Sequence, residues 1–188
     1  MSQTPIHVHV NVNPAADDIQ YAGLAVPLNN EAHRLSNQGD YEGAERLHLQ
    51  ALEVKDHAYG TEDIRCAVTY NALGETQLRL NKLDEAEANL RHAVAIREAH
   101  NRFNLDAAVS RENLAQVLEA KHKLDEAKAE RVRGAPTVCC GNYNCPGQLF
   151  KPDDMVTCGA CKSVFYCSAN CQGADWTGRH KGLCRKVD

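Results

Sequence analysis

The sequence predicts a mostly α-helical protein with a small, metal-stabilised domain at its C-terminal end. Apolar residues recur at helical spacing from Leu28 to Val132. Eight of the nine cysteines follow Gly134. Hydrophobic residues make up 43% of the chain but aromatic residues only 5%, which indicates a globular protein without one large core.

Residues 1–24 are expected to form a disordered tail. Pro5 and Pro14 lie on either side of the alternating segment His7–Val10 and disfavour a strand there. The first residues lack the basic region and apolar run of a signal peptide, and no stretch reaches the roughly 18 apolar residues of a membrane span. We therefore expect no membrane span and a cytoplasmic or nuclear location.

Residues 25–133 are predicted to form helical hairpin repeats. Three segments are alike: Gly39–Glu45 (GDYEGAE), Asn81–Glu87 (NKLDEAE) and His122–Lys128 (HKLDEAK). Small residues at fixed offsets within these copies let paired helices pack closely. One such pair cannot bury its apolar face, so successive hairpins must stack. The small residues are Ala44, Ala86 and Ala127, which are 42 and 41 residues apart, and Ala32, Gly74 and Ala115, twelve positions earlier in each copy.

This pattern resembles the tetratricopeptide repeat, in the longer form found in kinesin light chain-like proteins. The segment Tyr59–Ile64 resembles the extended loop between repeats of that form. The chain departs from the family where Trp is preferred, because Leu28, Tyr70 and Arg111 stand there. The alternative is a helical bundle without a groove.

The resemblance implies a concave face that binds extended peptides. One variety of the repeat binds C-terminal carboxylates through a clamp of Lys, Asn and Arg side chains. The corresponding positions here are Asn29, His33, Ala72, Val109 and Asn113, which include no cation. We therefore do not expect that clamp in this protein.

Residues 134–138 are predicted to be a linker, and residues 139–188 a second domain. The charge changes at this boundary, because residues 1–133 carry 15 Lys/Arg against 21 Asp/Glu, whereas residues 134–188 carry 6 against 4. The whole chain has a net charge of −4. A protein that binds nucleic acid through phosphates is usually basic, so we do not expect nucleic acid as a partner.

The second domain contains the pattern of a double zinc site. Zinc prefers four thiolate or imidazole ligands in a tetrahedron, and two donors with two or three residues between them can reach one ion. The pair of Cys140 and Cys145, with four residues between them, is the loosest. Cysteines in a chain without a visible route to an oxidising compartment indicate metal ligands rather than disulfides. The eight predicted ligands form four pairs: Cys140 and Cys145, Cys158 and Cys161, Cys167 and Cys171, and His180 and Cys184.

Spacing alone leaves two alternatives open. The first ligand is either Cys139 or Cys140, and we favour Cys140 because it gives the tighter loop to Cys145. The two Zn²⁺ ions are bound either by sequential or by interleaved pairs. Cys66, alone in the helical half, is expected to be a packed residue rather than a ligand.

Seven cysteines with a penultimate histidine resemble the MYND zinc finger. The likeness extends to the segments Val164–Ser168 and Cys171–Cys184. A RING finger has its histidine in the middle of the series, and a two-Cys two-His finger needs a second histidine, so neither fits. The resemblance implies interleaved sites, one from Cys140, Cys145, Cys167 and Cys171, the other from Cys158, Cys161, His180 and Cys184.

The resemblance also implies that the finger binds proline-rich peptides, with Gln172 and Trp176 lining the groove. A flat indole suits proline rings, and a proline-rich segment is ordered before it binds. The alternative for Trp176 is a core residue of the finger. Each predicted zinc site is closed by four protein ligands, so we expect structural metals.

The predicted function is therefore a zinc-binding adaptor, in which the finger binds one protein and the repeats another. The alternative is a nuclear transcriptional or chromatin cofactor that recruits corepressors through the finger. We do not expect an enzyme. Methyltransferases with MYND fingers also contain a SET domain, for which this chain has no room, and the sequence contains no nucleotide-binding loop or catalytic triad motif.

Overall fold

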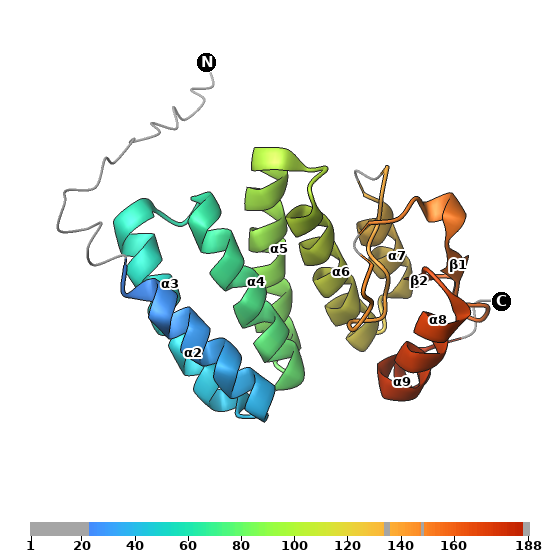
Figure 1. The fold of residues 1–188 in the computed structure, drawn as a ribbon, viewed down its shortest axis with the longest axis horizontal. Helices are drawn as coiled ribbons and strands as arrows, with labels where there is room; N and C mark the ends of the chain where they lie inside the picture. The colour runs from blue at the N-terminus through green and yellow to red at the C-terminus, as the bar shows by residue number, and fades with distance from the viewer. Residues whose placement is uncertain (1–22, 134–135, 148, 186–188) are drawn as a thin grey trace, which may run out of the picture.

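A computed structural model describes residues 23–133, 136–147 and 149–185 of the protein. In this part of the chain, long helices pack in a row of antiparallel hairpins, and the cysteine-rich finger lies at the end of the row (Figure 1). Residues 1–22 of the expected tail and residues 134–135 of the expected linker lie outside the described residues. The helices are α2 (Ala25–Gln38), α3 (Tyr41–Tyr59), α4 (Ile64–Arg79), α5 (Leu83–Asn101), α6 (Leu105–Ala120) and α7 (Leu124–Val132).

The three hairpins share one turn geometry. Gly39 follows α2 with a φ of 85°, and its N–H donates to Ser36 O at 3.0 Å. Asn81 and His122 take the same left-handed conformation, with φ of 59° and 60°, between the helices of the next two hairpins. Asp40 then begins α3 by accepting a hydrogen bond from Gly43 N. The predicted repeat of helical hairpins is therefore confirmed.

The small residues of the repeat lie where helices approach each other most closely. A Cβ added to Gly74 would lie 2.5 Å from Leu90 Cγ. Leu90 fills that space and has no exposed surface. The other small residues are also buried, at Ala32, Ala44, Ala86, Ala115 and Ala127.

A buried polar contact also repeats along the row. Asn29 Nδ2 donates to Thr69 Oγ1 at 2.9 Å, and Lys55 Nζ donates to the same oxygen at 2.8 Å. This arrangement joins the first helix of one hairpin to the first helix of the next. It recurs at the next boundary, with Asn71, Ser110 and Arg97 in the equivalent places.

The finger is built from short elements around its cysteines. They are the 3₁₀ turn η1 (Pro152–Asp154), β1 (Val156–Thr157), β2 (Phe165–Tyr166), α8 (Ala169–Asp175), the π-helical turn η2 (Trp176–His180) and α9 (Lys181–Leu183). The two strands pair antiparallel, with Val156 opposite Tyr166. Ser168 begins α8 by accepting a hydrogen bond from Cys171 N at 3.2 Å.

The finger packs directly against the last hairpin. Leu124 of α7 packs against the cluster of buried cysteines. Arg131, near the end of α7, is buried and donates to Ser163 O at 2.9 Å. The sequence predicted two domains joined by a linker, and the structure adds a shared interface between them.

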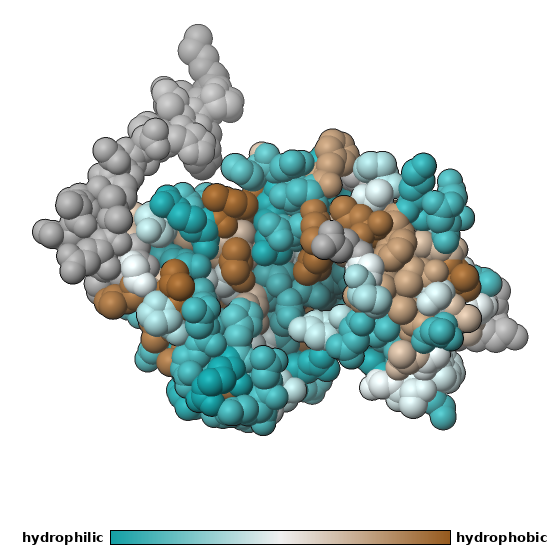
Figure 2. Space-filling model, viewed as in Figure 1, coloured by the Kyte–Doolittle hydropathy of each residue, from teal (hydrophilic) through white to brown (hydrophobic). Residues whose placement is uncertain are grey.

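The surface differs between the two parts. On the face shown in Figure 2, hydrophilic residues dominate over α2 to α5, whereas neutral and hydrophobic residues are denser over the finger. Among the described residues, no helix combines the length and the apolar character needed to cross a bilayer.

We expect Leu90→Ala to lower the free energy of unfolding by about 2–5 kcal/mol, because it leaves a cavity between α4 and α5. The matched control is Leu49→Ala on α3, where the leucine is 48% exposed, and we expect a change within about 0.5 kcal/mol. Chemical denaturation followed by circular dichroism measures both. Equal losses in the two variants would contradict the packing described here.

Candidate metal centres and binding groove

The first cysteine cluster joins the start of the finger to helix α8. Cys145 and Cys167 have their sulfurs 3.5 Å apart, and Cys167 and Cys171 also lie 3.5 Å apart. Cys140 completes the group, in which all four sulfurs lie within 4.8 Å of one another. Asn142 Nδ2 approaches Cys171 Sγ at 3.4 Å, as a donor to a thiolate would.

The second cluster joins the β1–β2 turn to the end of the finger. Cys161 Sγ lies 3.4 Å from His180 Nε2, and Cys158 Sγ lies 3.8 Å from Cys184 Sγ. The four ligand atoms are again within 4.8 Å of one another. The turn that carries Cys158 and Cys161 is tight, because Lys162 N donates back to Cys158 O at 3.0 Å.

Both clusters fit a tetrahedral zinc ion. Zn–S bonds of about 2.3 Å in a tetrahedron separate two sulfurs by about 3.8 Å, close to the distances of 3.5 and 3.8 Å found here. Neither cluster includes a carboxylate, and a set of thiolates with one imidazole is typical of zinc rather than of calcium or magnesium. The structure groups the residues in the interleaved manner, and not sequentially.

The remaining cysteines lie outside both clusters. Cys139 is half-buried, and burial raises the pKa of its thiol to about 12. Cys66 is buried in α4, where burial likewise raises the pKa of its thiol to about 12. Both side chains therefore stay protonated, and neither thiol is poised to act as a nucleophile.

The predicted peptide-binding residues lie on the last helical segment of the finger. Trp176 is 38% exposed, and its ring meets the His180 ring edge-on with the centroids 6.0 Å apart. Gln172 lies one turn earlier and is half-buried. Asp175, between them, is buried and accepts hydrogen bonds from Tyr166 Oη and from Arg179, so it braces this helix.

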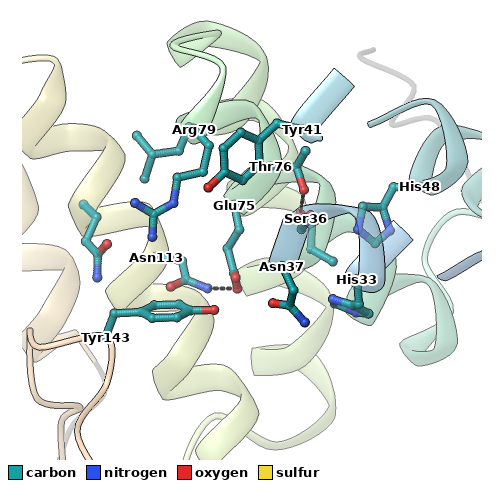
Figure 3. A pocket seen from close by; sticks show the side chains of 13 residues that line it. His33, Ser36, Asn37, Tyr41, His48, Glu75, Thr76, Arg79, Asn113 and Tyr143 are labelled. Atoms are coloured by element: carbon teal, nitrogen blue, oxygen red, sulfur yellow. Dashed lines mark hydrogen bonds between the residues drawn. The ribbon is translucent and has the colours of Figure 1, made fainter. Parts of the chain in front are cut away.

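A groove runs along the first helices of the hairpins and reaches the finger (Figure 3). It contains a cavity of about 300 Å³. A second cavity of about 290 Å³ adjoins it and lies against the first cysteines of the finger. Glu75, Asn113, Gln116 and Tyr143 line both cavities. Tyr143 belongs to the finger, so repeats and finger form this groove together.

Burial and contacts with neighbouring side chains affect the titratable groups of the groove. Burial raises the pKa of Glu75, although Asn71 and Asn113 donate hydrogen bonds to its carboxylate. The guanidinium carbon of Arg79 lies 5.7 Å from the centre of the Tyr143 ring, within the range of a cation–π contact. Burial, together with the nearby His33, lowers the pKa of His48 to about 4, so His48 is neutral at pH 7.

Some of these groove residues were visible in the sequence and others were not. Of the clamp positions considered there, His33, Ala72 and Asn113 line the first cavity and Val109 the second. Glu75 and the cation Arg79 were not predicted from the sequence. Tyr143 was not predicted either, because only the docking of the finger brings this side chain to the repeats.

Comparison with known families agrees with this architecture. Residues 23–99 match the tetratricopeptide repeat family, and residues 138–184 match the MYND finger. The chain therefore contains a tetratricopeptide repeat region followed by a MYND finger. The hairpin of α6 and α7 extends the row of helices beyond the matched repeat region.

A solved structure resembles part of the chain. The crystal structure of BtubC (BKLC) from P. vanneervenii is similar with 26% sequence identity and a TM-score of 0.56. The similarity covers 63% of this chain and 48% of that chain, so the protein spans about half the length of this neighbour. The neighbour fits the kinesin light chain-like form of the repeat. No curated protein matches the chain.

We expect Cys161→Ser to reduce the zinc content of the purified full-length protein from two ions per chain to one, because it removes a ligand of the second cluster. The matched control is Cys139→Ser, which should retain two ions because Cys139 lies outside both clusters. Elemental analysis by mass spectrometry gives the content. Loss of an ion from Cys139→Ser would identify Cys139 as the first ligand instead.

Proposed function

We propose that this protein is a zinc-binding adaptor, which binds one protein segment in the groove of its repeats and a proline-rich segment on its finger. The main support for this proposal is the groove that the repeats and the finger form together. Its walls come from α2, α3, α4, α6 and the finger. A partner held there contacts both modules at once.

The chemistry of the groove suits an extended peptide. Asn37 is exposed and offers an amide group that both donates and accepts hydrogen bonds. Asn113 and Gln116 line the same cavity, with their amide nitrogens donating to Glu75 and Glu112. A peptide main chain presents the complementary donors and acceptors at regular intervals. Tyr41 and Tyr143 add aromatic surface at the edges of the same cavity (Figure 3), and this surface can cover apolar side chains of the peptide.

The finger offers a separate surface. Trp176 follows Gln172 by four residues, so the two side chains lie on one face of the helical segment. Exposed tryptophan beside a hydrogen-bonding amide matches the chemistry by which aromatic grooves bind proline-rich segments. Binding of two different segments would make the protein a bivalent adaptor.

In this adaptor, zinc binding stabilises the fold of the finger. Each cluster has four protein ligands, which is typical of structural rather than catalytic zinc. Thiolate ligands also need a reducing environment, since oxidation would remove them. We therefore propose a cytoplasmic or nuclear location for the protein and two structural Zn²⁺ ions per chain.

We expect selection from a displayed peptide library to yield two classes of ligand for the zinc-loaded protein. Proline-rich peptides should be lost with Trp176→Ala and kept with the double variant Asn37→Ala/Tyr143→Ala. Peptides of the second class should show the reverse pattern. All three substituted side chains are exposed, so we expect both variants to fold. The single variant is then the control for the double variant, and the double variant is the control for the single one.

Two results would contradict the proposal. If neither variant changes the selected peptides, these surfaces are not the binding sites. If the zinc-loaded protein selects no peptides, it does not act as a peptide-binding adaptor.

A further inference from the structure

A buried cluster of charges lies where the last hairpin meets the finger. At its centre is Glu119 of α6, whose side chain has no exposed surface. Its Oε1 lies 2.6 Å from Arg131 Nη2 of α7, and its Oε2 lies 2.5 Å from Arg179 Nη1 of the finger. Arg131 also pairs with Glu112 at 2.7 Å, and Arg179 pairs with Asp175 at 2.8 Å. The repeats and the finger thus share one network of ion pairs.

The imidazole of His180 lies between this network and the second cysteine cluster. Its Nε2 points to Cys161 Sγ at 3.4 Å, and its Nδ1 lies 3.4 Å from Glu119 Oε2. The Nδ1 atom is buried and has no hydrogen-bond partner among the described residues, and the carboxylate of Glu119 is the acidic group that lies beside it. One ring nitrogen therefore faces the ligands of the predicted zinc site, and the other faces a carboxylate from the repeats.

This arrangement has a well-defined role at zinc sites. An imidazole that binds zinc through one nitrogen carries its proton on the other, and a carboxylate that accepts this proton fixes the tautomer and the ring orientation. The partner also makes the imidazole a stronger ligand. Here the partner comes from a helix of the repeat region and not from the finger that contains the ligand.

We propose that Glu119 is the outer-sphere partner of His180, so that the repeat region completes a zinc site of the finger. The proposal rests on the zinc binding described above. It makes Glu119 a positioning residue, which acts on the metal through His180. The first cluster has no such partner, because its four ligands are all cysteines, and it therefore serves as a control within the same molecule.

The same carboxylate also holds Arg131 and Arg179, so its effect on docking must be separated from its effect on zinc. Glu112 provides the matched control. It pairs with the same Arg131, with Nε–Oε2 and Nη2–Oε1 distances of 2.7 and 3.0 Å, and lies on the same helix. Glu112→Gln weakens the docking network and leaves the Glu119–His180 contact in place.

The test measures the metal affinity of each site in the full-length protein. Co²⁺ is suitable, because its visible spectrum distinguishes a site of four sulfurs from a site of three sulfurs and one nitrogen. Titration against a chelator of known affinity then gives two dissociation constants. We expect Glu119→Gln to weaken the His180 site by about 10–100-fold and to leave the four-sulfur site unchanged, whereas Glu112→Gln changes neither.

A second variant keeps the test decisive if Glu119→Gln does not fold. Glu119→Asp keeps the negative charge near both arginines but draws the carboxylate back by one methylene from His180. We expect it also to weaken the His180 site selectively.

The inference is overturned if the folded variants keep normal affinity at the His180 site, or if Glu112→Gln weakens that site as much as Glu119→Gln does. The latter result would show that docking alone affects the metal. If the wild-type protein binds metal at neither site, the proposed zinc binding itself is wrong, and this inference is wrong with it.

Discussion

Glu119 is a carboxylate without access to water, and the arrangement of the two modules depends on the groups that surround it. A buried charge is destabilising unless opposite charges and hydrogen-bond donors compensate for it. One arginine comes from the repeats, whereas Arg179 and His180 come from the finger. All of these groups must be in place together, so this carboxylate favours one orientation of the finger on the repeats.

That orientation connects the metal sites to the groove. Zinc binding to a small finger contributes directly to its folding free energy. The folded finger places Tyr143 beside the repeats, where its ring faces Arg79 and lines both cavities. The groove is thus formed by both modules, and its finger side exists only when the finger is folded and docked. If the groove binds a peptide as proposed, this dependence links zinc occupancy to peptide binding without any direct contact between metal and peptide.

The sequence predicted those features that depend on spacing along the chain. Small residues such as Gly74 recur with the hairpins, and ligand pairs three to five positions apart lie in tight turns or in a single helix turn. The interleaved grouping followed only from a family resemblance, because spacing allows either grouping. Glu119 and Tyr143 could not be found in this way, because their roles arise when distant segments meet. The repeated contact of Asn29 with Thr69 was in principle visible, since Asn29, Asn71 and Asn113 lie at intervals of 42 residues.

The central claim is that the repeats and the finger form one zinc-dependent unit. Hydrogen exchange of the full-length protein, measured with two zinc ions bound and after their removal by a chelator, tests this claim most directly. If the claim is correct, removal of zinc accelerates exchange in the finger and also in α6 and α7, while α2 and α3 keep their protection. If exchange in α6 and α7 does not change when the finger loses its zinc, the two modules fold independently and the claim is wrong.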